Sequence, residues 1–240
     1  MPSTHVVKAF DDELQTVISK IIQMGGRVEW LFSASVDALL SGSTDRAASL
    51  IAEDADIDRL EAAIEDDAIL VIARRQPVAT DLRDVFSAVK IASELERIGD
   101  LGKTIAKRAV LLGDDRVVRS ARAAISDMAN FARNQLKTVL DAYVENDAAK
   151  ATSVRNADAA LDTHYTACFR QILTYMMEDP RNISSCVHLL HVAKSVERVG
   201  DHTTNIAEYV LYRVTGEIPR DDRPKGEAIE SVLAAEAQRS

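Results

Sequence analysis

Apolar residues recur at intervals of three and four along almost the whole chain, and strand-like alternation is nearly absent. That spacing places apolar side chains on one face of an α-helix, whereas a half-buried strand would place them at every second position. The pattern is interrupted by residues that cap or stop helices. The interruptions fall at 41–45, Gln76-Pro77, 113–115, 146–147 and 179–182, and Gly216 with Pro219 closes the last periodic segment.

These interruptions divide the chain into six long helices. The expected helices cover residues 8–40, 45–75, 81–112, 116–144, 147–177 and 183–214. A helix of about 30 residues is about 45 Å long, and long helices joined by short turns form antiparallel bundles. The pattern therefore predicts an all-α protein. After the last helix, we expect a flexible C-terminal tail over 217–240, with a short helix near 227–237.

Two segments of the chain occur twice. The segment Glu96–Asp100 returns as Glu197–Asp201, 101 residues later, with valine in place of isoleucine. One helix earlier, the Asp-x-x-x-Asp spacing that starts at Asp54 returns at Asp158, 104 residues later. The simplest explanation is a duplicated three-helix unit. The expected domains are a bundle over residues 1–113, a second bundle over residues 114–216 and the tail 217–240.

Each repeat carries pairs of acidic residues four positions apart, which are neighbours on one face of a helix. Like charges at that spacing repel, so they cost stability unless a cation lies on them. Adjacent antiparallel helices could bring two pairs together, giving four carboxylates per unit. Hard oxygen ligands suit Mg, Mn, Ca or Fe rather than Zn. The candidate metal ligands are Glu96, Asp100, Glu197, Asp201, Asp54, Asp58, Asp158 and Asp162.

The same acidic pairs have simpler explanations. They could form a solvated acidic face, or they could pair with Arg97 and Arg198, which lie inside the two motifs. Gly99 and Gly200 are also ambiguous. A glycine inside a helix costs about 1 kcal/mol relative to alanine. Its presence in both copies indicates the close approach of another backbone, a bound ion or tight helix packing.

Composition and charge exclude several classes of protein. A net charge of -9 and a pI of about 5.1 argue against nonspecific nucleic-acid binding, which needs a basic surface. The chain has no apolar run long enough to span a bilayer, and its first ten residues lack the apolar stretch of a signal peptide. Cys168 and Cys186 lack CxxC spacing, so they are predicted to be reduced core thiols in a reducing compartment.

The sequence shows no recognisable catalytic motif. His188 and His191 are three residues apart and His202 follows Asp201, but each is more typical of packing or surface than of a ligand. Di-iron bundles use Glu-x-x-His, whereas Gly200 follows Glu197 at that spacing. No Ser-His-Asp or Cys-His arrangement and no glycine-rich phosphate loop stands out.

Several further segments complete the set of motifs, and the most specific are the two Glu-Arg-Ile/Val-Gly-Asp segments. The set comprises Met24-Gly25-Gly26 with Val28-Glu29, Arg75–Arg83, Glu94–Asp100, Leu173–Asp179, and Ser195–Asp201 with Asn205-Ile206. Together these segments resemble the PhoU family of phosphate-signalling regulators. The likeness extends from about Phe10 to about Gly216, nearly the whole chain.

The resemblance implies two tandem three-helix bundles related by pseudo-twofold symmetry. It implies a regulator rather than an enzyme, one that keeps the phosphate-starvation regulon off when phosphate is plentiful. The implied partners are the ATPase subunit of the phosphate ABC transporter and a sensor histidine kinase, at the cytoplasmic face of the inner membrane. A homodimer is also expected, without nucleic acid and without insertion into the membrane.

Family members that bind metal use E(D)xxxD motifs, which implies metal ions such as Mg, Mn or Fe at the carboxylates named above. One departure is that Thr104 in the first copy is matched by Asn205 in the second. If that side chain touches the metal, the two sites need not be equivalent. The competing interpretations are a carboxylate-type metal enzyme or metal-storage bundle, and a structural helical protein with solvated acidic pairs.

Overall fold

Helices make up all the regular structure of this protein over the residues that the structure describes. The computed structural model describes residues 4–219, with the side chains of Phe10 and of residues 12–219. No strand occurs among them, so the all-α prediction is confirmed. The helices are α1 (Thr4–Ser41), α2 (Thr44–Leu50), α3 (Asp54–Arg75), α4 (Thr80–Leu112), α5 (Arg116–Glu145), α6 (Ala148–Asn156), α7 (Asp158–Glu178), the 3₁₀ turn η1 (Pro180–Asn182) and α8 (Ile183–Thr215).

The six expected helices are present as six rods, but two of the rods are interrupted. The prediction of unbroken helices over 45–75 and 147–177 was wrong, because α2 and α3 are separated at 51–53 and α6 and α7 at Ala157. Asp54 and Asp158 begin the second part of each rod. A helix N-terminus has free N–H groups and a favourable dipole for an anion, which suits these carboxylates. The apolar spacing continues across both interruptions, so periodicity did not reveal them.

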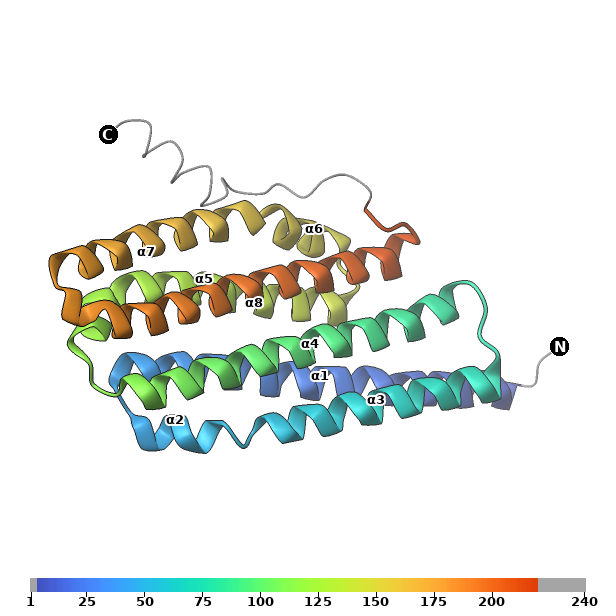
Figure 1. The fold of residues 1–240 in the computed structure, drawn as a ribbon. Coiled ribbons are helices and arrows are strands. Elements are labelled where there is room, and N and C mark those ends of the chain that lie inside the picture. The colour runs from blue at the N-terminus through green and yellow to red at the C-terminus, as the bar shows by residue number, and fades with distance from the viewer. Residues whose placement is uncertain (1–3, 220–240) are drawn as a thin grey trace.

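The rods form two three-helix bundles that lie side by side along their length (Figure 1). In the first bundle α1 packs against α3 and α4, and in the second α5 packs against α7 and α8. The bundles meet where α4 packs along α8 and α1 along α5. α4 and α8 have 33 residues each, so each extends for about 50 Å. One continuous hydrophobic core runs through both bundles, which makes them a single packed unit.

A polar contact near the end of α8 also joins the two bundles. Arg213 donates from Nε to Asp84 Oδ1 on α4 at 3.0 Å and from a terminal nitrogen to the backbone oxygen of Tyr143 on α5 at 3.1 Å. Its guanidinium carbon lies 4.7 Å from the centre of the Tyr143 ring. Because Arg213 and Asp84 are largely buried, this contact fixes the position of α8 relative to α4 and α5.

The described part of the chain ends shortly after α8. Of the expected tail 217–240, only Glu217–Pro219 is described and it is not helical. The rest of the tail, with the expected short helix near 227–237, lies outside the described residues. Among the described helices, none has a stretch that is both long and apolar enough to cross a membrane.

Candidate functional site

The first carboxylate cluster forms where the start of α3 crosses the middle of α4. Gly99 allows this close crossing, because a Cβ at that position would lie 2.9 Å from Ile57 Cδ1 and 3.7 Å from Asp54 Oδ1. The second bundle repeats the arrangement, since a Cβ at Gly200 would overlap the side chain of Leu161. Both glycines therefore serve tight packing of one helix on the next, and in the first bundle that packing places a carboxylate against α4.

Asp54 is the most deeply placed member of the first cluster, with 2% of its surface exposed. Its Oδ2 accepts a hydrogen bond from Lys103 Nζ at 2.5 Å. Its Oδ1 is buried and has no hydrogen-bond partner among the described residues. Lys103 Nζ also lies 3.9 Å from Asp100 Oδ1. The hydrogen bond that Lys103 donates to Asp54 raises the pKa of Lys103, and the charges of Asp54, Asp100 and Asp58 add to that effect, so the ammonium form is favoured.

Burial and mutual repulsion both raise the pKa values of neighbouring carboxylates in the first cluster. Burial raises the pKa of Asp58, and the charges of Asp54 and Asp100 raise it further. Burial likewise raises the pKa of Glu96, with further increases from Asp100, Glu61 and Asp58. The charges of all four predicted ligands of the first unit are therefore linked, since Asp58 is affected by Asp54 and Asp100, and Glu96 is affected by Asp58 and Asp100. Sequence analysis missed Glu61, whose position one turn beyond Asp58 was the signal that could have found it.

Arg97 makes the contact that the alternative interpretation proposed, but only at the surface. Its Nε lies 3.4 Å from Glu96 Oε2, and its side chain is 60% exposed. An exposed ion pair of this kind contributes about 0–1 kcal/mol. The cation in contact with the buried carboxylate is Lys103, a residue that sequence analysis did not single out.

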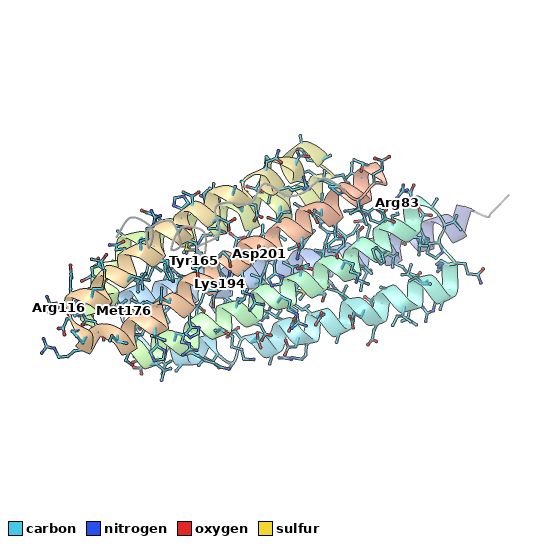
Figure 2. All side chains as sticks on the ribbon, turned by 45° about the horizontal axis from the view of Figure 1, so that its top comes forward. Arg83, Arg116, Tyr165, Met176, Lys194 and Asp201 are labelled. Carbon is cyan, nitrogen blue, oxygen red and sulfur yellow. The ribbon has the colours of Figure 1, made fainter. Side chains whose placement is uncertain are left out.

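The second cluster lies between the start of α7 and the middle of α8. Burial raises the pKa of Glu197, and the charges of Asp201 and Asp162 raise it further. Lys194 Nζ lies 2.7 Å from Glu197 Oε2 and 5.3 Å from the centre of the Tyr165 ring. Figure 2 shows Tyr165, Lys194 and Asp201 along this stretch of the second bundle. Tyr165 follows Glu61 by 104 residues, so the second unit has a phenol where the first has a carboxylate.

A hydroxyl group is among the partners of the deepest carboxylate of the second cluster. Asp158, which is 8% exposed, accepts a hydrogen bond at Oδ1 from Thr204 Oγ1 at 3.2 Å. Thr204 follows Lys103 by 101 residues, the offset of the repeated motif. The position of Lys103 in the first unit is therefore occupied by a threonine in the second.

The contact between the bundles includes His188, His202 and Asn205. Asn205 Nδ2 donates to Glu94 Oε2 at 2.9 Å, and His202 Nδ1 lies 2.7 Å from the same oxygen. Farther along the same helices, a terminal nitrogen of Arg108 lies 2.8 Å from His188 Nδ1. Asn205, which corresponds to Thr104 in the first unit, thus contributes a hydrogen bond between α8 and α4.

The donor set of the clusters fits a hard cation, although no ready-made coordination sphere is present. Across residues 4–219, no three His, Cys, Asp or Glu side chains already converge as metal ligands. The buried and unpartnered Oδ1 of Asp54 nevertheless offers an oxygen ligand beside other carboxylates. Metal binding by the eight predicted residues stays a prediction.

The two cysteines are part of the hydrophobic core. Cys168 and Cys186 are both buried and unpaired. Burial raises the pKa of Cys168 to about 11 and also raises the pKa of Cys186. Thiols of this kind are weak nucleophiles, which agrees with the prediction of core residues.

An apolar cavity of about 760 Å³ lies at the far end of the first bundle and was not predicted from the sequence. The 75–83 motif forms the turn beside it, in which Gln76 and Ala79 both have a φ of 49°. Apolar side chains gathered in this way commonly mark contact with a ligand or a protein. The lining includes Ile69, Ile72, Leu82, Arg83, Phe86 and Tyr212.

These features define a class of protein, a duplicated helical bundle with a carboxylate cluster at the same place in each half. The model of the PhoU domain matches the chain twice, at residues 21–109 and 125–210. The chain therefore belongs to the PhoU family.

Named relatives and solved structures show how far the likeness extends. The chain is 44% identical over 225 residues to the "Phosphate-specific transport system accessory protein PhoU homolog" of Rhizobium meliloti, covering 94% of this chain and 95% of that protein. A protein of the same name from Caulobacter vibrioides is 42% identical over 221 residues, covering 92% of this chain and 96% of that one. The crystal structure of PhoU from Pseudomonas aeruginosa has a TM-score of 0.81 at 36% identity, covering 87% of this chain and 100% of that chain. The regulatory protein PhoU from Streptococcus pneumoniae has a TM-score of 0.81 at 29% identity, covering 88% and 100%.

Proposed function

We propose that this protein is a negative regulator of phosphate uptake and of the phosphate-starvation regulon. It acts as an adaptor between the ATPase subunit of the phosphate ABC transporter and a sensor histidine kinase, at the cytoplasmic face of the inner membrane. One observation carries the proposal: relatives named as accessory proteins of a phosphate-specific transport system align with it over nearly the full length of both chains. The protein works as a homodimer and is not an enzyme.

The carboxylate clusters are the part of the chain that we assign to regulation through a metal ion. Mg, Mn or Fe is the proposed ion, held by Glu96, Asp100, Asp54 and Asp58 in the first unit. The second site consists of Glu197, Asp201, Asp158 and Asp162. A bound ion supplies positive charge that relieves repulsion within each cluster. Since each cluster spans two helices, binding links α3 to α4 and α7 to α8.

A reporter for the phosphate regulon tests this assignment in cells. The double variant Glu197→Gln with Asp201→Asn removes two charges at nearly constant shape, and Glu96→Gln with Asp100→Asn is the matching change in the first unit. We expect the reporter to switch on in phosphate-rich medium while protein abundance, measured by immunoblot, stays normal. The matched control is Asp141→Asn with Glu145→Gln, an exposed acidic pair on α5 with the same spacing.

Two outcomes separate the parts of the proposal. A silent reporter with both cluster variants would show that the carboxylates are not needed for repression. A pull-down from phosphate-replete cells tests the adaptor assignment independently of the clusters. We expect the wild-type protein to recover the transporter ATPase and the sensor kinase. If it recovers neither protein, the adaptor role is refuted.

A carboxylate-type metal enzyme or metal-storage protein is the second candidate. The observation in its favour is the clustering of Asp54, Asp58, Glu96, Asp100 and Glu61 on two neighbouring helices. Oxidase and phosphatase assays on protein loaded with Mn or Fe, together with the number of iron atoms retained per chain, decide between them. Turnover, or retention of many iron atoms, would favour this second function.

A further inference from the structure

We infer that Lys103 is a built-in counter-ion of the first carboxylate cluster and competes with a metal ion for Asp54. The inference rests on the metal binding proposed above and adds a residue that controls it. Lys103 Nζ contacts Asp54 Oδ2 at 2.5 Å and lies 3.9 Å from Asp100 Oδ1. Asp58 is the third carboxylate that acts on it. Its ammonium group thus contacts one proposed ligand, lies 3.9 Å from a second and is affected by the charge of a third.

Burial makes this ion pair hard to displace. The side chain of Asp54 is 3% exposed and that of Lys103 is 29% exposed. Charges attract more strongly where water is largely excluded, and removing one partner leaves the other charge uncompensated. A divalent cation that binds Asp54 must therefore move the ammonium group away or share the carboxylate with it. Either course weakens binding at the first cluster.

Lys103 also holds two helices together without a metal ion. It extends from α4 to the first turn of α3, the same two helices that a bound ion would join. Asp54 follows the interruption between α2 and α3, so the lysine fixes the place where the interrupted rod resumes. The first bundle has an internal cation that does part of the work expected of a metal ion.

The second cluster places its lysine differently. Thr204 stands 101 residues after Lys103 and donates a hydroxyl hydrogen bond to Asp158. Lys194 pairs instead with Glu197, and the side chain of the lysine is 50% exposed while that of Glu197 is 12% exposed. A half-exposed lysine is well hydrated when it leaves its partner, so it opposes an incoming cation less than Lys103 does. The two clusters are therefore expected to differ in metal affinity.

The test compares Mn²⁺ binding to the full chain before and after removal of the Lys103 charge. Lys103→Met keeps an unbranched side chain without the ammonium group. Bound Mn²⁺ is counted by electron paramagnetic resonance of the free ion, and the Kd comes from titration calorimetry. We expect Lys103→Met to bind Mn²⁺ at least about tenfold more tightly at one site, which corresponds to about 1.4 kcal/mol. Without metal, the same variant should unfold at a lower temperature than wild type, and Mn²⁺ should reverse that loss.

Two matched variants isolate the effect of the contact. Lys107→Met removes the same charge from an exposed position one turn along α4, and Lys103→Arg keeps the charge at the same position. Neither should gain affinity. Equal affinity of Lys103→Met and wild type, or an equal gain in Lys107→Met, would overturn the inference while leaving metal binding in place. If no variant and no wild-type protein binds Mn²⁺, the proposed metal binding itself fails, and the inference with it.

Discussion

Gly99 offers a test of how closely α3 and α4 pack at the first carboxylate cluster. Replacement of a helix-interior glycine by alanine normally stabilises a helix by about 1 kcal/mol. At Gly99 the new Cβ would lie 2.9 Å from Ile57 Cδ1 and 3.2 Å from Ile57 Cγ2. Ile57 is 1% exposed, so its side chain is enclosed by the core and cannot move out into solvent. Overpacking a well-packed core costs about 1–3 kcal/mol.

The expected net effect of Gly99→Ala is a loss of about 1 kcal/mol, because the packing cost exceeds the helix gain. Gly26→Ala is the matched control. Gly26 also lies inside a helix, but a Cβ there would meet nothing within 4 Å. That variant should gain about 1 kcal/mol. The two alanine variants should then differ by about 2 kcal/mol, or roughly 4–8 °C in Tm for a chain of this size.

Urea unfolding and thermal unfolding of both variants measure the difference. A double-mutant cycle with Ile57→Val, which removes the Cδ1 atom nearest the new methyl group, identifies the contact. Ile57→Val alone should cost about 0.5–1.5 kcal/mol, and less in the Gly99→Ala background because it relieves the overlap. The reasoning is refuted if Gly99→Ala stabilises the protein as much as Gly26→Ala, or if the two changes at the contact are additive.

Three further predictions follow from the clusters and the helix caps. Addition of Mn, Mg or Fe at about 100 times its Kd should stabilise the protein by about 2.7 kcal/mol and raise Tm by several degrees. A chelator should reverse this shift. The absence of a shift with all three metals would favour a solvated acidic face. Burial raises the folded-state pKa of Glu197 above its ordinary value of 4.5, so the folded protein binds this proton more tightly than the unfolded chain. Its contribution to stability is present below pH 4.5 and is lost as the pH rises through the folded pKa. Metal-free wild type should therefore lose stability relative to Glu197→Gln as the pH rises above 4.5. Parallel pH curves from urea unfolding would contradict this. Asp115 caps α5 by accepting a hydrogen bond from the Val117 amide at 2.7 Å, and it also accepts one from Ser185 Oγ at 2.7 Å. Asp115→Ala should therefore cost about 1–2 kcal/mol in urea unfolding. Asp114→Ala, which removes an exposed surface pair, should cost about 0.5 kcal/mol or less in the same experiment.

The sequence by itself determined the class of structure and the place of the candidate site. Apolar spacing of three and four reports which face of each segment is buried, so it predicted the six helical rods and their turns. The repeated Glu96–Asp100 and Glu197–Asp201 segments predicted two equivalent units. The i, i+4 spacing of acidic residues is a local property of a helix, so the carboxylate pairs were found without knowledge of their neighbours.

The tertiary structure alone decided which side chains complete each cluster. Lys103 lies one turn beyond Asp100, and only the crossing of α4 over α3 shows that its ammonium group reaches Asp54 rather than solvent. The packing of α3 on α4 also adds Glu61 to the first cluster, and the packing of α7 on α8 places Tyr165 in the second. Periodicity identifies a buried face but not the helix that covers it. A long flexible side chain also has too many rotamers for its charged end to be placed from spacing. The partners of the carboxylates, and with them the difference between the two units, therefore depend on how the helices pack.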